Sequence, residues 1–182
     1  MKIQNILVCL FAALIASGSF IQIPLFFGVP ISVQDMLVIL SGMLLGPFYG
    51  TLSVLLFLFM GSLGLPVFTG KGGIGILLFS PTCGFLFGYI FASFFAGLLS
   101  KQFIKYKNYM SWQTFVQYLF ASIISTIVLF IFGILGFMKI TESSFSKSFA
   151  ICVFPFIPGN IFKIILSVFI TQKLKPIVRN YL

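Results

Sequence analysis

Long apolar runs fill most of this chain, and glycine and proline separate them more often than charged residues do. Hydrophobic residues make up 60% of the 182 positions, charged residues 7%, and the mean hydropathy is +1.20. A soluble domain of this size needs far more polar surface to cover its core. In a bilayer, a helix of roughly 20 apolar residues crosses the hydrocarbon and pairs its own backbone groups. The sequence therefore predicts an all-α membrane protein, folded as a single domain over residues 1–182.

The apolar runs divide into six predicted transmembrane helices with short loops, at roughly 20 residues for each span. The run from Val33 to Leu63 is too long for one comfortable span, and Gly46-Pro47 interrupts it. Because Gly-Pro breaks helices, this run is predicted to form two short spans joined by a tight turn. The segment 64–81 is rich in glycine and proline yet apolar, so we expect it to fold back as a lid or as a partly buried segment. The other spans are expected at residues 3–23, 82–99, 112–137 and 149–174.

Lysine and arginine outnumber the acidic residues by 11 to two, which gives a net charge of +9. In a soluble protein this charge would suggest nucleic acid. Here the basic residues lie mostly at the edges of apolar runs, where the positive-inside rule places them, and no nucleic-acid partner is expected. Six spans with both termini in the cytoplasm leave Lys71, Lys139 and Lys147 outside. The inner side then holds Lys2, Lys101, Lys105, Lys107, Lys173, Lys175 and Arg179.

Lys163 lies well inside the last apolar run, too far from either end to reach water easily. A lysine at such a position costs about 2.5–3.5 kcal/mol on insertion scales, so it should face a cavity or a partner. Because Asp35 and Glu142 are the only acids, we do not expect an acid of this chain to pair with it. Lys163 is therefore predicted to face an anionic or polar ligand. The alternative is a structural lysine bound to backbone carbonyls.

Asn160 precedes Lys163 by one helical turn, so the two side chains share a helix face. Asparagine offers both hydrogen-bond donors and an acceptor, which suits an amide or urea ligand. A hydrogen bond between two helices is the alternative interpretation of Asn160. Together, the two residues favour a binding site.

The segment Gly70-Lys71-Gly72-Gly73 resembles a phosphate-binding loop without meeting its requirements. Leu65 stands at the first glycine position of the Walker pattern, and Gly72 replaces the Ser or Thr that would hold magnesium. We therefore expect no nucleotide hydrolysis by this chain. The glycines either let the backbone approach a ligand closely or form a flexible turn.

Catalytic chemistry is not expected from these residue types. The chain has no histidine, and its two acids lie far apart in sequence. That inventory supplies neither an obvious acid–base pair nor a metal site. The chain is predicted not to be an enzyme and to hold no metal or cofactor.

Small residues occupy one face of the first predicted span. Ala12 and Ala16 are separated by one helical turn, with Ser19 nearby. A small-xxx-small pattern lets two helices approach closely, either inside one bundle or between subunits. The sequence alone leaves both possibilities open.

Several stretches, in their order and spacing, resemble the BioY family, whose members are the biotin-capturing S components of energy-coupling factor (ECF) transporters. The matching stretches are Pro30–Gln34, Leu44–Gly50, Gly61–Phe68, the glycine loop, Ser80–Gly88 and Pro155–Lys163. The resemblance covers essentially the whole chain. It implies the six-helix S-component fold, a site open to the outside, and a lid made by the loop between the third and fourth spans.

The resemblance also implies a ligand and partners. The ligand would be biotin, and the partners would be a transmembrane coupling protein and a pair of cytoplasmic ATPases in a bacterial plasma membrane. In S components the Ala-xxx-Ala face of the first span docks against the coupling protein, and Ala12 and Ala16 fit that pattern. Two alternatives stay open: an S component for another vitamin, and a non-transporting membrane protein in which Lys163 is structural.

By resemblance, Asn160 and Lys163 would bind the polar end of biotin, Phe85 and Tyr89 would pack against its ring, and Lys71 would meet its carboxylate. The loops around Gln34 and the glycines would cover the site. The expected substrate-binding residues are Gln34, Lys71, Gly72, Gly73, Thr82, Gly84, Phe85, Tyr89, Asn160 and Lys163.

The chain departs from the usual family pattern at three of these motif positions. Asn160 stands where the family usually has Asp, Phe85 replaces a usual Tyr, and Cys83 replaces the first of two glycines. Phe85 keeps the stacking face of the ring and loses the hydroxyl. Without a carboxylate at position 160, Lys163 is expected to lack its counter-ion and to rely more on the oxygens of the ligand.

Overall fold

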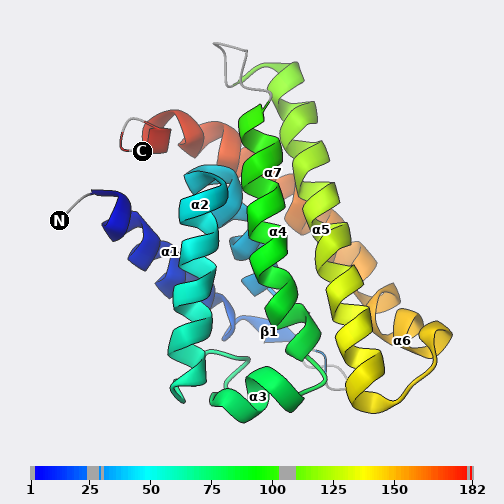
Figure 1. Cartoon of the computed structure of the whole chain (residues 1–182). Coiled ribbons are helices and arrows are strands. Elements are labelled where there is room, and N and C mark those ends of the chain that lie inside the picture. Colours follow the sequence, from blue (N-terminus) through cyan, green and yellow to red (C-terminus); the bar gives the residue numbers. More distant parts are fainter. Residues whose placement is uncertain (1–2, 24–28, 30, 103–109, 180, 182) are drawn as a thin grey trace.

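The computed structural model describes residues 3–23, 29, 31–102, 110–179 and 181, and most of these are helical (Figure 1). The long helices are α1 (Ile3–Gly18), α2 (Gln34–Ser62), α4 (Cys83–Gln102), α5 (Trp112–Thr141) and α7 (Ile157–Arg179). The shorter elements are the strands β1 (Gln22–Ile23) and β2 (Ile31–Ser32), the helices α3 (Ile74–Phe79) and α6 (Phe145–Cys152), and the 3₁₀ turn η1 (Phe154–Phe156). Within the described residues, four stretches are long and apolar enough to cross a membrane: Gln34–Ser62, Cys83–Lys101, Trp112–Thr141 and Phe145–Arg179. The prediction of an all-α membrane protein is confirmed.

Helix α2 is two helices joined at a sharp break. Gly46 has φ 84° and ψ 177°, which lies outside the helical region, and Pro47 follows it. A proline disfavours helical backbone in the residue before it, and glycine tolerates positive φ. A Cβ on Gly50 would lie 2.6 Å from the Cα of Gly42, so the two halves fold back against each other. Counted as two, the halves of α2 bring the long helices of the described chain to the predicted six.

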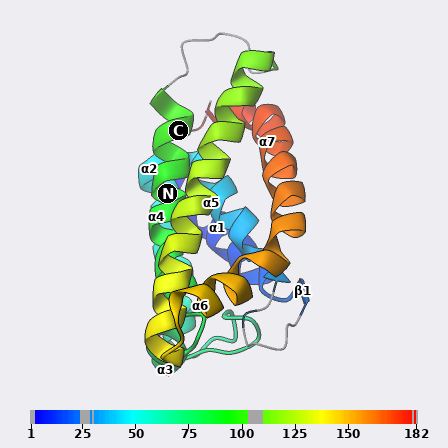
Figure 2. The same cartoon turned by 90° about the vertical axis from the view of Figure 1, so that its right-hand side faces the viewer.

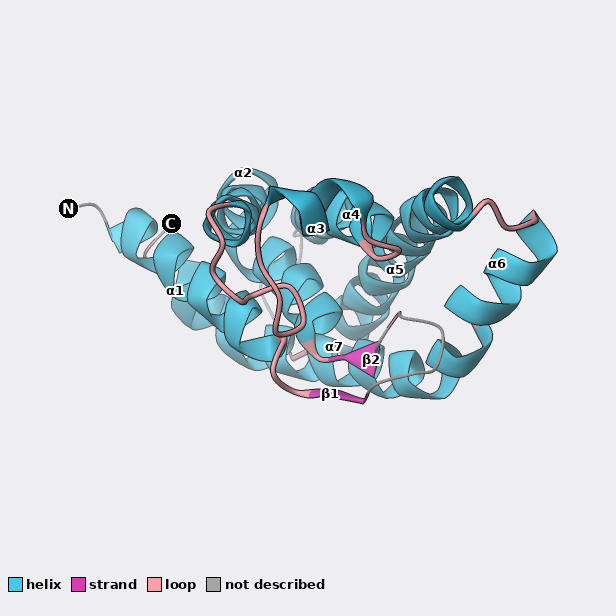
Figure 3. Ribbon diagram, turned by 90° about the horizontal axis from the view of Figure 1, so that it is seen from below, coloured by secondary structure: helices cyan, strands magenta, loops and turns pink. Residues whose placement is uncertain are grey.

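The helices form a bundle with α2 and α4 at its centre. Helix α2 packs against α1, α4 and α7, and α5 packs against α4 and α7. The second half of α2, α4 and α5 stand side by side, and α1 and α7 cross on the other side of them (Figures 1 and 3). Glycine allows close crossings: a Cβ on Gly84 would lie 2.3 Å from the carbonyl oxygen of Phe132 in α5.

One end of the bundle carries the short elements. Helices α3 and α6 and strand β1 gather there, while both chain termini lie away from this end (Figures 1 and 2). Strands β1 and β2 pair antiparallel, with Gln22 opposite Ser32. Gly73 donates its backbone N–H to the Gly61 carbonyl oxygen at 2.8 Å, which folds the segment before α3 back onto the end of α2.

The boundaries of two predicted spans differ from the structure. Helix α1 ends at Gly18 rather than near residue 23, because the chain turns there and enters β1. The last apolar run is broken around Pro155 into α6, η1 and α7, and α7 continues to Arg179. Lys175 is 6% exposed rather than at an open membrane edge. The predicted positions of Lys2, Lys105 and Lys107 fall outside the described residues.

Candidate functional site

A cavity of about 530 Å³ lies at the end of the bundle that carries the short elements. The beginning of α2, the segment after α2, and helices α4 and α5 supply most of its wall. The lining residues are Val29, Ser32, Gln34, Asp35, Phe68, Thr69, Thr82, Phe85, Leu86, Tyr89, Leu129, Phe130 and Phe156.

Aromatic rings form one wall of this cavity. The rings of Phe85 and Phe156 are nearly parallel, with centroids 6.5 Å apart and an interplanar angle of 20°. Phe130 meets both rings edge-on at 6.0 Å. Such a cluster offers a flat apolar ligand both ring faces and ring edges.

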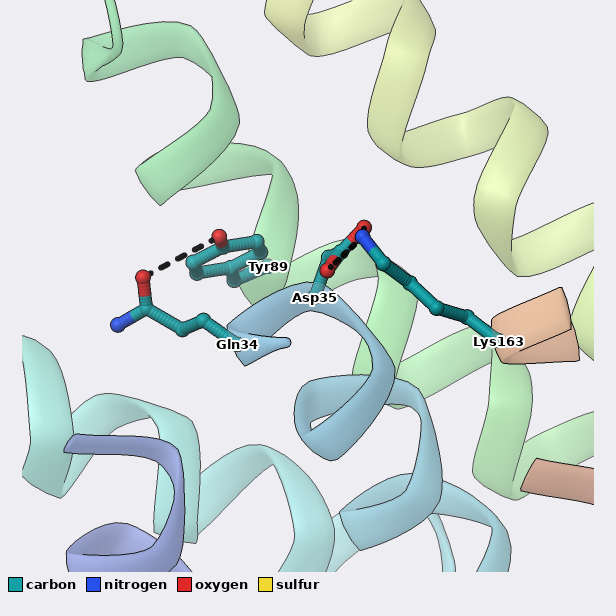
Figure 4. A network of polar contacts seen from close by, with 4 residues as sticks. All are labelled: Gln34, Asp35, Tyr89 and Lys163. Atoms are coloured by element: carbon teal, nitrogen blue, oxygen red, sulfur yellow. Dashed lines mark hydrogen bonds and ion pairs between the residues drawn. The ribbon is translucent and has the colours of Figure 1, made fainter. Parts of the chain in front are cut away.

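An ion pair forms part of the polar boundary of the cavity. The Lys163 ammonium on α7 donates to both carboxylate oxygens of Asp35 on α2, at 2.9 and 3.0 Å (Figure 4). Their side chains are only 12% and 16% exposed. The expectation that no acid of this chain pairs with Lys163 was therefore wrong. Position 160 holds Asn and gives Lys163 no counter-ion, as expected, but Asp35 supplies one from α2.

A smaller pocket of about 200 Å³ continues from the same ion pair. Asp35, Asn160 and Lys163 line it together with Ser122 and Thr126. Asn160 is 7% exposed, and its Nδ2 has no hydrogen-bond partner among the described residues. Asp35 lines both pockets, so it connects the aromatic cavity with the buried amide of Asn160.

Gln34 ties two parts of the cavity wall together. Its Nε2 donates to the Val67 carbonyl oxygen at 3.3 Å, and its Oε1 accepts from the Tyr89 hydroxyl at 3.5 Å (Figure 4). The residue is 1% exposed. Gln34 thus holds the segment after α2 against α4, and both Gln34 and Tyr89 line the cavity, as does Thr82.

The glycine loop approaches the cavity with different residues from those predicted. Phe68 and Thr69 line the cavity, whereas Lys71, Gly72 and Gly73 do not. Lys71 is exposed, and its backbone pairs with that of Phe68.

Gly84 does not line the cavity either, and both Gly72 and Gly84 serve close backbone contacts instead. A Cβ on Gly72 would lie 2.2 Å from the Leu65 carbonyl oxygen, so this glycine is needed where the loop folds on itself. Gly84 faces α5 at the crossing described above.

Sequence reasoning missed Asp35, Phe68 and Phe156 as parts of the cavity wall. Phe68 and Phe156 lie in stretches rich in aromatic residues, and nothing in the pattern sets them apart. Asp35 did carry a usable indication: it is one of only two acids and it opens an apolar run. An acid in such a place is a candidate functional residue in its own right.

The small residues of α1 point into the chain rather than away from it. Ala12 is completely buried and belongs to the hydrophobic core, and Ala16 packs against that core while partly exposed. The exposed side of α1 carries larger side chains such as Leu10 and Leu14. Ala12 therefore serves packing against α2 inside this chain.

Comparison with known proteins gives consistent matches along the whole chain. Residues 2–180 match the model of the BioY family. The chain is 37% identical to a biotin transporter BioY of Rhizobium etli over 164 residues, which cover 89% of this chain and 87% of that protein. It is 35% identical to a biotin transporter BioY of Rhodobacter capsulatus over 170 residues, which cover 88% and 87% of the two chains.

A solved structure matches the fold as well. The crystal structure of the S-component for biotin from an ECF-type ABC transporter superposes with a TM-score of 0.85. The two chains are 31% identical, and the match covers 95% of this chain and 90% of the other. With its fold and its sequence in agreement, the chain belongs to the BioY family.

Proposed function

We propose that this protein is the biotin-binding membrane subunit of an ECF-type vitamin transporter. It captures biotin on the outer side of the membrane and delivers it inward, without carrying out chemistry of its own. Relatives that are 37% and 35% identical to it over the matched residues are named biotin transporters, and its structural neighbour is an S-component for biotin.

One observation carries the proposal: Asp35 joins an aromatic cavity to an ion pair with Lys163 and to the buried Asn160 amide, whose nitrogen has no partner among the described residues. Biotin has an apolar fused ring, a ureido group with two N–H donors and a carbonyl oxygen, and a flexible tail ending in a carboxylate. The rings of Phe85 and Phe156 suit the apolar part. Lys163 and Asn160 suit the carbonyl oxygen of the ureido group.

The remaining expected residues take supporting roles in this proposal. Gln34, Thr82 and Tyr89 shape the cavity wall, and Gly84 keeps α4 close to α5 behind it. Gly72 and Gly73 let the loop fold over the cavity. Lys71, which is exposed on that loop, meets the biotin carboxylate at the cavity mouth.

The energy for transport comes from partners. The motifs of the chain include no nucleotide-binding loop, so a transmembrane coupling protein and a pair of cytoplasmic ATPases drive release of biotin inside.

The whole chain, 1–182, acts as one domain in a bacterial plasma membrane with both termini in the cytoplasm. The end that carries α3 and the cavity then faces outward. Of the predicted contact residues Ala12 and Ala16 on α1, only the partly exposed Ala16 is accessible to the coupling protein.

Calorimetric titration of the purified protein in lipid nanodiscs tests the ligand assignment. Biotin should bind saturably with one molecule per chain. Absence of heat at micromolar biotin, together with binding of a different vitamin, would overturn the assignment.

Proteoliposomes then test transport: uptake of labelled biotin should require the coupling protein and ATPases. Uptake by this chain alone would contradict the dependence on partners.

A further inference from the structure

Three polar side chains from two helices meet around the smaller pocket. Asp35 comes from the first turn of α2, and Asn160 and Lys163 come from α7. We infer that Asp35 determines which polar group the site accepts, by receiving a hydrogen bond from an N–H of the ligand while it holds Lys163 in place. The inference rests on the proposed function, in which the ligand is biotin and the N–H belongs to its ureido group.

The Asp35 carboxylate can accept a hydrogen bond from a ligand while it pairs with Lys163. Each carboxylate oxygen can accept more than one hydrogen bond, and the Lys163 ammonium is the side-chain partner that the structure gives it. The first turn of a helix and the Lys163 ammonium both stabilise negative charge on the Asp35 side chain. Because Asp35 lines both pockets, its carboxylate is within reach of a ligand in the aromatic cavity.

The donors around Asp35 complete a pattern for one class of ligand. Lys163 carries three N–H donors, and the Nδ2 of Asn160 is buried without a partner among the described residues. Two donors therefore flank one acceptor, and the charges of Asp35 and Lys163 balance. That arrangement matches a neutral group with a carbonyl oxygen next to an N–H, as in a cyclic urea or amide.

The same arrangement disfavours a carboxylate at this point. Asp35 repels a second negative charge, and the charge of Lys163 is already neutralised at 2.9 Å. Asp35 therefore fixes the direction in which biotin enters: the ureido group faces the ion pair, and the carboxylate stays at the mouth of the cavity.

The test combines a change in the protein with a change in the ligand. The protein is the full chain in nanodiscs, titrated with biotin and with the two biotin derivatives that carry a methyl group on one ureido nitrogen. Asp35→Asn keeps the shape of the side chain and removes its charge. Its affinity for biotin should fall by roughly 30-fold or more, as is typical when one partner of a buried charge pair is lost. Glu142→Gln, the matched change at the other acid of the chain, should bind biotin like the parent.

The methylated ligands show whether Asp35 contacts biotin directly or only supports the fold. The parent should prefer biotin strongly over the derivative that lacks the N–H facing Asp35, and Asp35→Asn should lose most of that preference. A loss of affinity by the same factor for all three ligands would overturn the inference, because Asp35 would then only support the pocket. Full-strength biotin binding by Asp35→Asn would overturn it as well.

A second variant guards against misfolding of the first. Asp35→Asn combined with Lys163→Gln leaves no unpaired charge in the bundle, so it should fold even where the single variant does not. It should likewise fail to prefer biotin over the methylated derivatives, and a retained preference would contradict the role of Asp35. Failure of the parent protein to bind biotin at all is a different result, which would overturn the proposed function itself.

Discussion

The Lys175 ammonium on α7 donates a hydrogen bond to the backbone carbonyl of Met43, near the end of the first half of α2. Ser100 on α4 donates to the same carbonyl oxygen at 3.3 Å. The helical hydrogen bonds stop at Gly46, so carbonyls of this last turn need partners from elsewhere. A cation at a helix C-terminus is also electrostatically favourable. The Met43 carbonyl therefore joins α2, α4 and α7 at the break in α2.

Lys175→Met should destabilise the protein without weakening biotin binding. The change keeps an apolar side chain of similar length and removes a charge-assisted hydrogen bond, which is worth about 1.5–3 kcal/mol. Lys175 lines neither pocket, so the affinity for biotin should stay within about twofold of the parent. A change of about 1.4 kcal/mol in binding free energy would instead alter the affinity tenfold. Thermal unfolding in nanodiscs measures the first effect and calorimetry the second. Lys173→Met, at an exposed lysine two positions earlier, should change neither, and an equal effect of both variants would contradict the role of the Met43 contact.

Lys163→Met should lower both stability and biotin affinity, because it leaves Asp35 buried without its counter-ion. Removing one partner of a buried pair costs about 3–5 kcal/mol. Adding Asp35→Asn removes the unpaired charge and should recover a large part of the stability, while biotin binding stays weak. Unfolding curves of the two single variants and the double variant give the coupling energy. A double variant no more stable than Lys163→Met would show that the pair is not the cause.

Phe85→Leu should weaken biotin binding through loss of the ring facing Phe156. An aromatic pair contributes about 0.5–1.5 kcal/mol beyond its buried area, so the affinity should fall by up to roughly tenfold. Phe87→Leu is the matched control, since Phe87 lies on the same helix and is 39% exposed on its outer side. Equal binding by the parent and Phe85→Leu would argue that the ligand lies elsewhere in the bundle.

Gln34→Leu should speed the dissociation of biotin. It removes the hydrogen bond to Val67, which is one of the contacts between the segment after α2 and the rest of the cavity wall. A neutral hydrogen bond contributes about 1 kcal/mol, so the dissociation rate should rise by about fivefold. Hydrogen exchange of residues 64–73 should become faster at the same time. Gln113→Leu, at an exposed glutamine of α5, should leave both measurements unchanged.

Local backbone chemistry explains what the sequence could predict of the fold. The break at Gly46-Pro47 depends on two adjacent residues, so it could be located without any knowledge of packing. The helical spans followed in the same way from apolar runs. The end of α1 at Gly18 could not be located, because it depends on pairing of β1 with β2, and two-residue strands leave no periodic pattern.

Only the part of the candidate site that lies on a single helix could be predicted from the sequence. Asn160 and Lys163 lie one turn apart, and the structure does bring both to the smaller pocket. Asp35 lies 128 residues from Lys163 along the chain, and no local pattern connects them. Glycines were ambiguous for another reason: the same residue type permits close approach of a ligand and close crossing of helices, and Gly84 serves the crossing.

Moving the carboxylate across the smaller pocket should preserve the site. The swap variant, Asp35→Asn with Asn160→Asp, keeps one acid, one amide and Lys163 around the same space, because positions 35, 160 and 163 all line it. Stability should stay within about 1.5 kcal/mol of the parent, since Lys163 keeps a carboxylate one helical turn away. Biotin affinity should recover to within about tenfold of the parent, far above that of Asp35→Asn alone. Calorimetric titration with biotin of the parent, Asp35→Asn and the swap variant measures these affinities. A folded swap variant that binds as weakly as Asp35→Asn would mean that the carboxylate must stand on α2, rather than anywhere beside Lys163.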